Sequence, residues 1–262
     1  GLCFIIALAA IIGTCMMGSG AADRIVRGML NVFGEQRSGI VLLLSGFILS
    51  IPVFFDTVFF LLIPLARALS LRTGKSYTLY VIAMAGAGAI THSMVPPTPG
   101  PLLIAKNLDI EVGIAMMAGL CASILPALLV LAMAKRFDNK LNIPMREAPG
   151  TSAKDLQSVA DKKDSDLPSL LLSALPVALP VILISAVSIL KMAAKNPAEG
   201  SLYLTDGYKS FFHYLEFFGN PNVAMLIAAT IAILTYAQQI IRQDSNPNEK
   251  LSAKLGEKLS AP

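Results

Sequence analysis

The stretch that decides the fold is THSMVPPTPGP, residues 91–101. It places four prolines and one glycine within residues 96–101. A helix cannot continue through them, because each proline lacks a backbone N–H and clashes with the preceding turn. The stretch lies inside residues 76–105, which contain no Asp, Glu, Lys or Arg. Non-helical backbone at membrane depth is tolerated only where protein buries it or where it lines a watery cavity. We therefore predict a re-entrant or broken membrane helix at 76–105 that forms a binding site; the alternative is a tight loop between two ordinary spans.

The composition predicts a membrane protein. Of the 262 residues, 55% are hydrophobic and only 15% are charged, against about 25% charged residues in soluble domains. Residues 38–66 carry a single charge, Asp56. Charge is absent from four further runs, residues 1–22, 112–134, 167–190 and 217–241. Each run reaches the ~20 residues that an apolar helix needs to cross a bilayer. A soluble bundle would need polar faces on these segments, so the expected fold class is all-α, a polytopic transmembrane helical bundle.

The charged segments divide the chain into two membrane parts. The first is expected at 1–134, with spans at about 2–17, 39–66, 76–105 and 112–134, and the second at 167–241, with spans at about 167–190 and 217–241. A cytoplasmic loop at 135–166 separates them, and a polar tail follows at 242–262. Residues 21–37 are expected to form an amphipathic helix, either at the membrane surface or as a solvated connection. The loops can be divided between the two sides of the membrane. The side that includes the 135–166 loop and the tail has fourteen Lys or Arg, whereas the other side has seven. The excess predicts that the side with fourteen is cytoplasmic.

Asp56 is the first candidate for a functional role. A carboxylate in hydrocarbon costs on the order of 3 kcal/mol or more, so it normally faces the bundle interior and takes part in function. Pro52 and Pro64 flank it and predict a kinked or broken helix. We expect Asp56 to exchange protons; the alternative is a carboxylate that bonds a neighbouring helix backbone for packing. Thr57 could bind a ligand or bond the carbonyl of its own preceding turn.

His92 is the only titratable side chain in residues 91–101. An imidazole can relay protons or hold an anionic ligand, whereas the structural alternative is a histidine that caps a broken helix. Helix N-termini at such breaks can bind substrate carboxylates. The expected substrate-binding residues around the break are Thr91, Ser93, Pro97, Thr98 and Gly100. Lys106 could attract an acid substrate, but a lysine that marks the membrane interface is the simpler interpretation.

The sequence contains no known enzyme signature. It lacks the metalloprotease, nucleophile-elbow and phosphate-loop motifs. Its three cysteines lie in apolar segments without a Cys-x-x-Cys pair, so they give no metal-ligating pattern. We expect no enzyme, no metal and no cofactor, and the net charge of +4 gives no reason to invoke nucleic acid. A secondary active transporter is the first hypothesis. A passive channel subunit, and a membrane-embedded hydrolase using His92 and Ser93, are the alternatives.

Two strings carry a family resemblance, IPVFFDTVFFLLIPLA at residues 51–66 and HSMVPPTPGP at residues 92–101. Both resemble the gluconate permease (GntP) family of proton symporters, and the Gly18-Ser19-Gly20 turn that leads into Asp23-Arg24 is also similar. The resemblance covers about residues 1–135.

The resemblance implies proton-coupled uptake of gluconate or a related sugar acid across the bacterial inner membrane. Asp56 and His92 would couple the proton, and no other cofactor would be needed. The partners would be the sugar acid and the lipid bilayer. The resemblance does not decide whether the protein forms a homo-oligomer, or whether it is a D-serine-type or sodium-coupled carrier. The family is also similar to ion transporters with two inverted repeats and re-entrant hairpins, so this chain would be a fragment of a two-repeat fold. Its start at Gly1, inside an apolar run, likewise leads us to expect truncation.

Overall fold

The computed structural model describes residues 2–73, 77–141, 143, 166–194 and 214–244, and these residues contain helices and no strand. The helices, in chain order, are α1 (Leu2–Ser19), α2 (Ala21–Phe33), the 3₁₀ helix η1 (Glu35–Arg37), α3 (Ser38–Leu49), α4 (Phe55–Thr73), α5 (Tyr77–Met94), α6 (Pro99–Asn107), α7 (Val112–Leu141), α9 (Leu170–Ala194) and α11 (Pro221–Asp244). Residues 242–244 of the expected polar tail belong to α11, whereas the rest of that tail and most of the expected loop at 135–166 lie outside the described residues.

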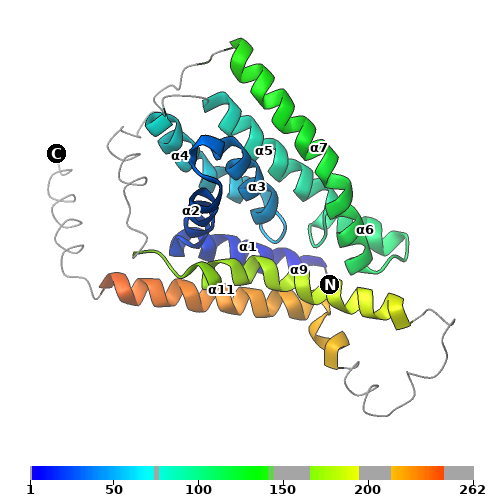
Figure 1. Cartoon of the computed structure of the whole chain (residues 1–262). Helices are drawn as coiled ribbons and strands as arrows, with labels where there is room; N and C mark the ends of the chain where they lie inside the picture. Colours follow the sequence, from blue (N-terminus) through cyan, green and yellow to red (C-terminus); the bar gives the residue numbers. More distant parts are fainter. Residues whose placement is uncertain (1, 74–76, 142, 144–165, 195–213, 245–262) are drawn as a thin grey trace.

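The helices form two groups (Figure 1). In one group α11 packs against both α1 and α9, and in the other α5 packs against α3, α7 and α4. Contacts of α7 with α9, and of α2 with both α3 and α9, join the groups.

Among the described residues, four helical segments are long and apolar enough to cross a membrane: Tyr77–Asn107, Val112–Leu141, Leu170–Leu190 and Pro221–Arg242. A fifth is added if Cys3–Ser19 and Ala21–Phe33, which are bent by 68°, count as one span. The bend occurs at Gly20, whose φ of 73° is a left-handed conformation that glycine adopts without steric cost. The all-α, polytopic membrane fold predicted from the sequence is confirmed.

Residues 21–37 form an amphipathic element, as their pattern predicts. The apolar face of α2 is buried through Ala21, Ala22, Ile25 and Val26, and it packs between α3 and α9. After the bend at Gly20, α2 packs against neighbouring helices, so its apolar face covers other parts of the protein.

The segment expected as a span at 39–66 is two helices. The chain leaves α3 after Leu49 and enters α4 at Phe55, so the segment is broken around Pro52, whereas Pro64 lies inside α4. The 12 residues of α3 extend about 18 Å, too short for a hydrocarbon core of about 30 Å. α4 also continues to Thr73 and includes Arg67 and Arg72, beyond the expected end of the span at residue 66.

The central stretch is broken where the prolines predict it. α5 ends at Met94, α6 begins at Pro99, and the Pro96–Pro97 peptide bond between them is cis. The two helices together make one candidate span, Tyr77–Asn107, of 31 residues.

The next helix, α7, runs beyond residue 134 to Leu141, into the region expected as a loop. A contact of its last turns explains the extension: the backbone N–H of Leu79 donates a hydrogen bond of 3.3 Å to Asp138 Oδ1. The carboxylate therefore accepts from one of the N–H groups at the start of α5 that have no partner within the helix.

Candidate functional site

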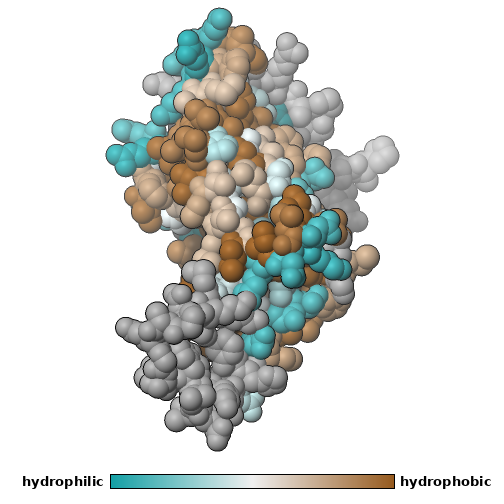
Figure 2. All heavy atoms as spheres, turned by 90° about the vertical axis from the view of Figure 1, so that its right-hand side faces the viewer, coloured by the Kyte–Doolittle hydropathy of each residue, from teal (hydrophilic) through white to brown (hydrophobic). Residues whose placement is uncertain are grey.

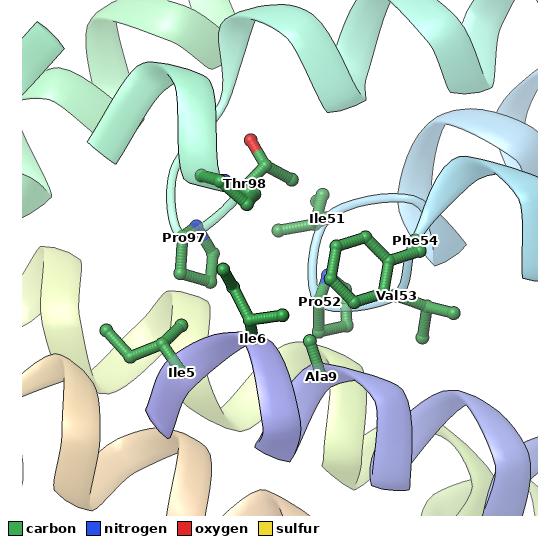
Figure 3. A pocket seen from close by; sticks show the side chains of 10 residues that line it. Ile5, Ile6, Ala9, Ile51, Pro52, Val53, Phe54, Pro97 and Thr98 are labelled. Atoms are coloured by element: carbon green, nitrogen blue, oxygen red, sulfur yellow. The ribbon is translucent and has the colours of Figure 1, made fainter. Parts of the chain in front are cut away.

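The two broken segments meet on the surface of α1. Figure 3 shows the loop between α3 and α4 facing the loop between α5 and α6, with α1 beneath both. The side chains around the junction come from all three elements: Ile5, Ile6, Ala9, Ile51, Pro52, Val53, Phe54, Pro97, Thr98 and Pro99. The space between them is about 10 Å³, roughly enough for one water molecule. The contact between the breaks is therefore closed and largely apolar.

Apolar packing holds the two breaks in place. Ile51 of the first break and Val95 of the second belong to one buried cluster. The cluster is completed by Met116 of α7, Ile184 of α9 and Ala224 of α11. Both helix groups thus contribute to the support of the site.

Glycines allow the closest approaches around the breaks. A Cβ atom built on Gly119 would lie 2.2 Å from the carbonyl oxygen of Met94, and one built on Gly88 would lie 2.9 Å from Ser50 Oγ. A side chain on Gly119 would push two backbones apart, whereas one on Gly88 would displace Ser50 Oγ and the Phe55 ring. Gly119 therefore brings α7 directly against the second break, and Gly88 brings α5 directly against the first.

Asp56 lies in the first turn of α4, directly after the first break. Asp56 is exposed within the described residues, whereas the sequence predicts that it faces the interior of the bundle.

His92 lies in the last turn of α5, directly before the second break, and is half-buried. Its ring centroid is 5.8 Å from that of Phe54 in the first break. Its Nδ1 atom is buried and has no hydrogen-bond partner among the described residues. The structural alternative, a histidine that caps the broken helix through this atom, is therefore not what the geometry shows.

The predicted hydroxyl groups are divided between the interior and the surface. Thr91 is fully buried and donates a hydrogen bond of 3.1 Å to the Ala87 carbonyl of its own helix. Thr98 lines the junction and donates to the Val95 carbonyl at 2.7 Å, which closes the turn between α5 and α6. The methyl group of Thr57 faces Gly13 of α1, whereas Ser93 is exposed.

The N-terminus of α6 offers fewer donors than an ordinary helix. Pro99 and Pro101 have no N–H, and the N–H of Leu102 bonds the Thr98 carbonyl at 3.0 Å. Only the N–H of Gly100 is left in the first turn. Gly100 is exposed, and no atom lies within 4 Å of the place where its Cβ would be. The N-terminus of α4, which contains no proline in its first turn, keeps the larger number of unpaired donors.

Ser50 is a candidate that sequence reasoning missed. It is the C-cap residue of α3, it is fully buried, and its hydroxyl has no hydrogen-bond partner among the described residues. A buried hydroxyl without a partner is costly and often marks a functional site. The signal available in the sequence was its position directly before Ile51-Pro52.

The polar groups therefore surround the apolar junction and do not fill it. Of the predicted residues, Pro97 and Thr98 line it, while Asp56 and His92 come from its two sides. Ser93 and Gly100 face outward. No group of three or more His, Cys, Asp or Glu residues comes together within the described part of the chain.

Comparison with known proteins gives a consistent result. The model of the GntP family permeases matches residues 1–258. The gluconate permease of Pseudomonas aeruginosa is 32% identical over 234 residues, which are 88% of this chain and 48% of the relative. The Gnt-II system L-idonate transporter of Escherichia coli is 29% identical over 261 residues, or 100% of this chain and 54% of the relative. An uncharacterised permease of Haemophilus influenzae is 29% identical, over 88% of this chain and 47% of its own length. The chain thus spans about half the length of the curated relatives it matches, and no solved structure matches it.

Proposed function

This chain belongs to the GntP family of permeases, and we propose that it acts in the proton-coupled uptake of gluconate or a related sugar acid across the bacterial inner membrane. Two relatives are a gluconate permease and an L-idonate transporter by name, and both names denote sugar acids. The family is one of transporters and not of enzymes, which disfavours the hydrolase alternative.

The observation that carries the proposal is the meeting of two broken helices, each with a titratable side chain next to its break. Asp56 follows the break between α3 and α4, and His92 precedes the break between α5 and α6. The ring of Phe54, two positions before Asp56, has its centroid 5.8 Å from that of His92, so the two breaks are neighbours although 36 positions separate Asp56 from His92 in the sequence (92 minus 56). An ionisable pair at broken membrane helices is the arrangement that proton-coupled carriers need.

In the proposed mechanism Asp56 accepts the coupling proton. His92, whose Nδ1 has an unused lone pair or proton position, relays the proton between the two breaks. The exposed hydroxyl of Ser93 and the N–H of Gly100 would bind the anionic substrate, together with the unpaired N–H groups at the start of α4. A negative substrate and a protonated Asp56 are favoured together, because the proton removes the repulsion between the two carboxylates.

The test is accumulation of labelled gluconate in right-side-out vesicles that contain the full-length protein, under an imposed pH gradient. Asp56→Asn keeps the shape of the side chain and removes its proton exchange. We expect this variant to equilibrate gluconate without concentrating it. Glu35→Gln, which neutralises an exposed carboxylate on η1, should accumulate gluconate normally.

Full proton-driven accumulation by Asp56→Asn would remove Asp56 from the mechanism. A wild-type protein that equilibrates gluconate but never concentrates it would instead support the passive channel. Accumulation driven by a sodium gradient alone would identify a sodium-coupled carrier.

A further inference from the structure

A second cavity, of about 390 Å³, opens near the end of α6 and shares Ile5 with the junction of the two breaks. It lies where the end of α6 and the turn into α7 approach the start of α11 and the first turns of α1. Its lining combines charged and apolar side chains: Ile5, Leu102, Leu103, Ala105, Lys106, Asp109, Ile110, Glu111, Val112, Pro221 and Asn222. The proposed transport mechanism uses none of these residues.

Three charged side chains line this cavity without neutralising one another. Lys106, Asp109 and Glu111 form no ion pair with each other or with another described residue. Asp109 has a φ of 52°. The hydrogen bonds from Asp109 N–H to the Lys106 carbonyl, 3.3 Å, and from Ile110 N–H to the Ala105 carbonyl, 2.8 Å, fix this turn. These are the two bonds of a Schellman motif, which hold the end of α6 in a single conformation.

Asn222, in the first turn of α11, adds an acceptor. Its Nδ2 donates to Asn220 Oδ1 at 3.2 Å, while its Oδ1 atom is buried and has no hydrogen-bond partner among the described residues. A buried acceptor without a donor is costly, so a donor supplied by a ligand would stabilise this wall of the cavity.

The charges define the ligand chemistry. One lysine and two carboxylates give the lining a net charge of −1, which disfavours a sugar acid. They suit a ligand that carries an anionic group for Lys106 and an ammonium group for Asp109, Glu111 and the Asn222 acceptor.

The apolar part of the lining selects a lipid among such ligands. Leu102, Leu103, Ile110 and Val112 line the cavity, and the neighbouring Ile104 and Leu108 are 58% and 63% exposed. The ends of three candidate spans, Tyr77–Asn107, Val112–Leu141 and Pro221–Arg242, meet here, at the level where headgroups lie. Figure 2 shows hydrophilic residues beside strongly hydrophobic ones on the face that includes this end of the molecule.

We propose that this cavity binds the headgroup of a zwitterionic aminophospholipid. Its phosphate would lie at Lys106, its primary ammonium would lie between Asp109, Glu111 and Asn222, and its acyl chains would lie along Leu103, Ile104 and Leu108. A trimethylated headgroup has no N–H to donate, and an anionic glycerol headgroup has no cation, so both should bind more weakly.

The test measures lipid retention by native mass spectrometry of the purified full-length protein. The protein is released from nanodiscs that contain equal amounts of phosphatidylethanolamine, phosphatidylcholine and phosphatidylglycerol. We expect preferential retention of phosphatidylethanolamine. The double variant Asp109→Asn/Glu111→Gln should reduce its retention by about tenfold or more, as expected for the loss of charged hydrogen bonds. Lys140→Gln, at the opposite end of α7, is the matched control and should retain the lipid like the wild type.

Equal retention of the three lipids would overturn the proposal, as would a preference that the double variant leaves unchanged. A further arm uses lipid-free detergent and labelled gluconate. If Lys106→Gln abolishes gluconate binding there while lipid retention is unchanged, the cavity is a substrate vestibule and not a lipid site.

Discussion

Replacing Gly119 with alanine should push α7 away from the break between α5 and α6. The new Cβ would start 2.2 Å from the Met94 carbonyl oxygen, 3.1 Å from its carbon and 3.3 Å from the Val95 Cα. Real Cβ contacts essentially never fall below 3.0 Å, so the two backbones would have to separate by about 0.8 Å (3.0 minus 2.2). All three atoms belong to the backbone, so rotation of a side chain cannot relieve the contact.

The magnitude follows from two opposed effects. Alanine favours a helix over glycine by about 1 kcal/mol, whereas overpacking of a buried contact costs typically 1–3 kcal/mol and sometimes more. Because all three contacts are with backbone atoms, we take about 2–3 kcal/mol for the overpacking, which leaves a net destabilisation of about 1–2 kcal/mol. We also expect reduced gluconate accumulation, because the shift moves Val95 and with it the junction of the two breaks.

Gly28→Ala is the matched control. The Cβ on Gly28 would lie 2.8 Å from Leu170 Cδ1, the end of a side chain that can rotate. This variant should be neutral or slightly more stable, because the gain in helix propensity remains. Thermal unfolding of the full-length protein, followed by circular dichroism, measures both variants. If Gly119→Ala melts at the wild-type temperature and transports normally, α7 does not approach the second break as closely as described.

Three further substitutions test the surroundings of the site. Ser50→Ala removes a buried hydroxyl without a partner. The melting temperature should therefore stay the same or rise, while the rate of gluconate uptake falls. A clear loss of stability would show that the hydroxyl is hydrogen-bonded. Asp138→Ala removes the acceptor for the Leu79 N–H and should destabilise the protein by about 0.5–2 kcal/mol, with a lower melting temperature as the readout; an unchanged melting temperature would refute the capping role. Thr98→Val removes the bond that closes the turn before α6 and should cost about 1 kcal/mol; Thr230→Val, at an exposed helical hydroxyl of α11, should cost less in the same melting assay.

Much of the fold could be predicted from the sequence because its causes are local. Runs without charge identify apolar helices wherever they pack. Proline ends or breaks a helix through its own ring and its missing N–H, so residues 96–101 predicted the break between α5 and α6. Pro52 and Pro64 show the limit of the same rule. One lies in a break and the other inside α4, and only the packing of the neighbouring helices separates the two cases.

The position of the candidate site could be predicted in part. The sequence singles out Asp56 and His92 because charge and imidazole are rare in apolar segments, and the structure places each next to a break. Pro97 and Thr98 belong to the break itself and line the junction. Ser50 was missed, since serine is common and its missing hydrogen bond is a property of the environment. The exposure of Asp56 within the described residues was also not predictable, because burial depends on which helices cover a position.

What the sequence determined by itself is the membrane character of the chain, most of its helices, the break at 95–98 and the titratable residues next to both breaks. Each of these depends on a few consecutive residues. Only the tertiary structure decided that the break at 50–54 meets the break at 95–98 on α1, and that Lys106, Asp109, Glu111 and Asn222 surround a second cavity. These arrangements depend on contacts between residues far apart in the chain. Close approaches such as that of Gly119 to Met94 set them, and no local pattern encodes which surfaces come together.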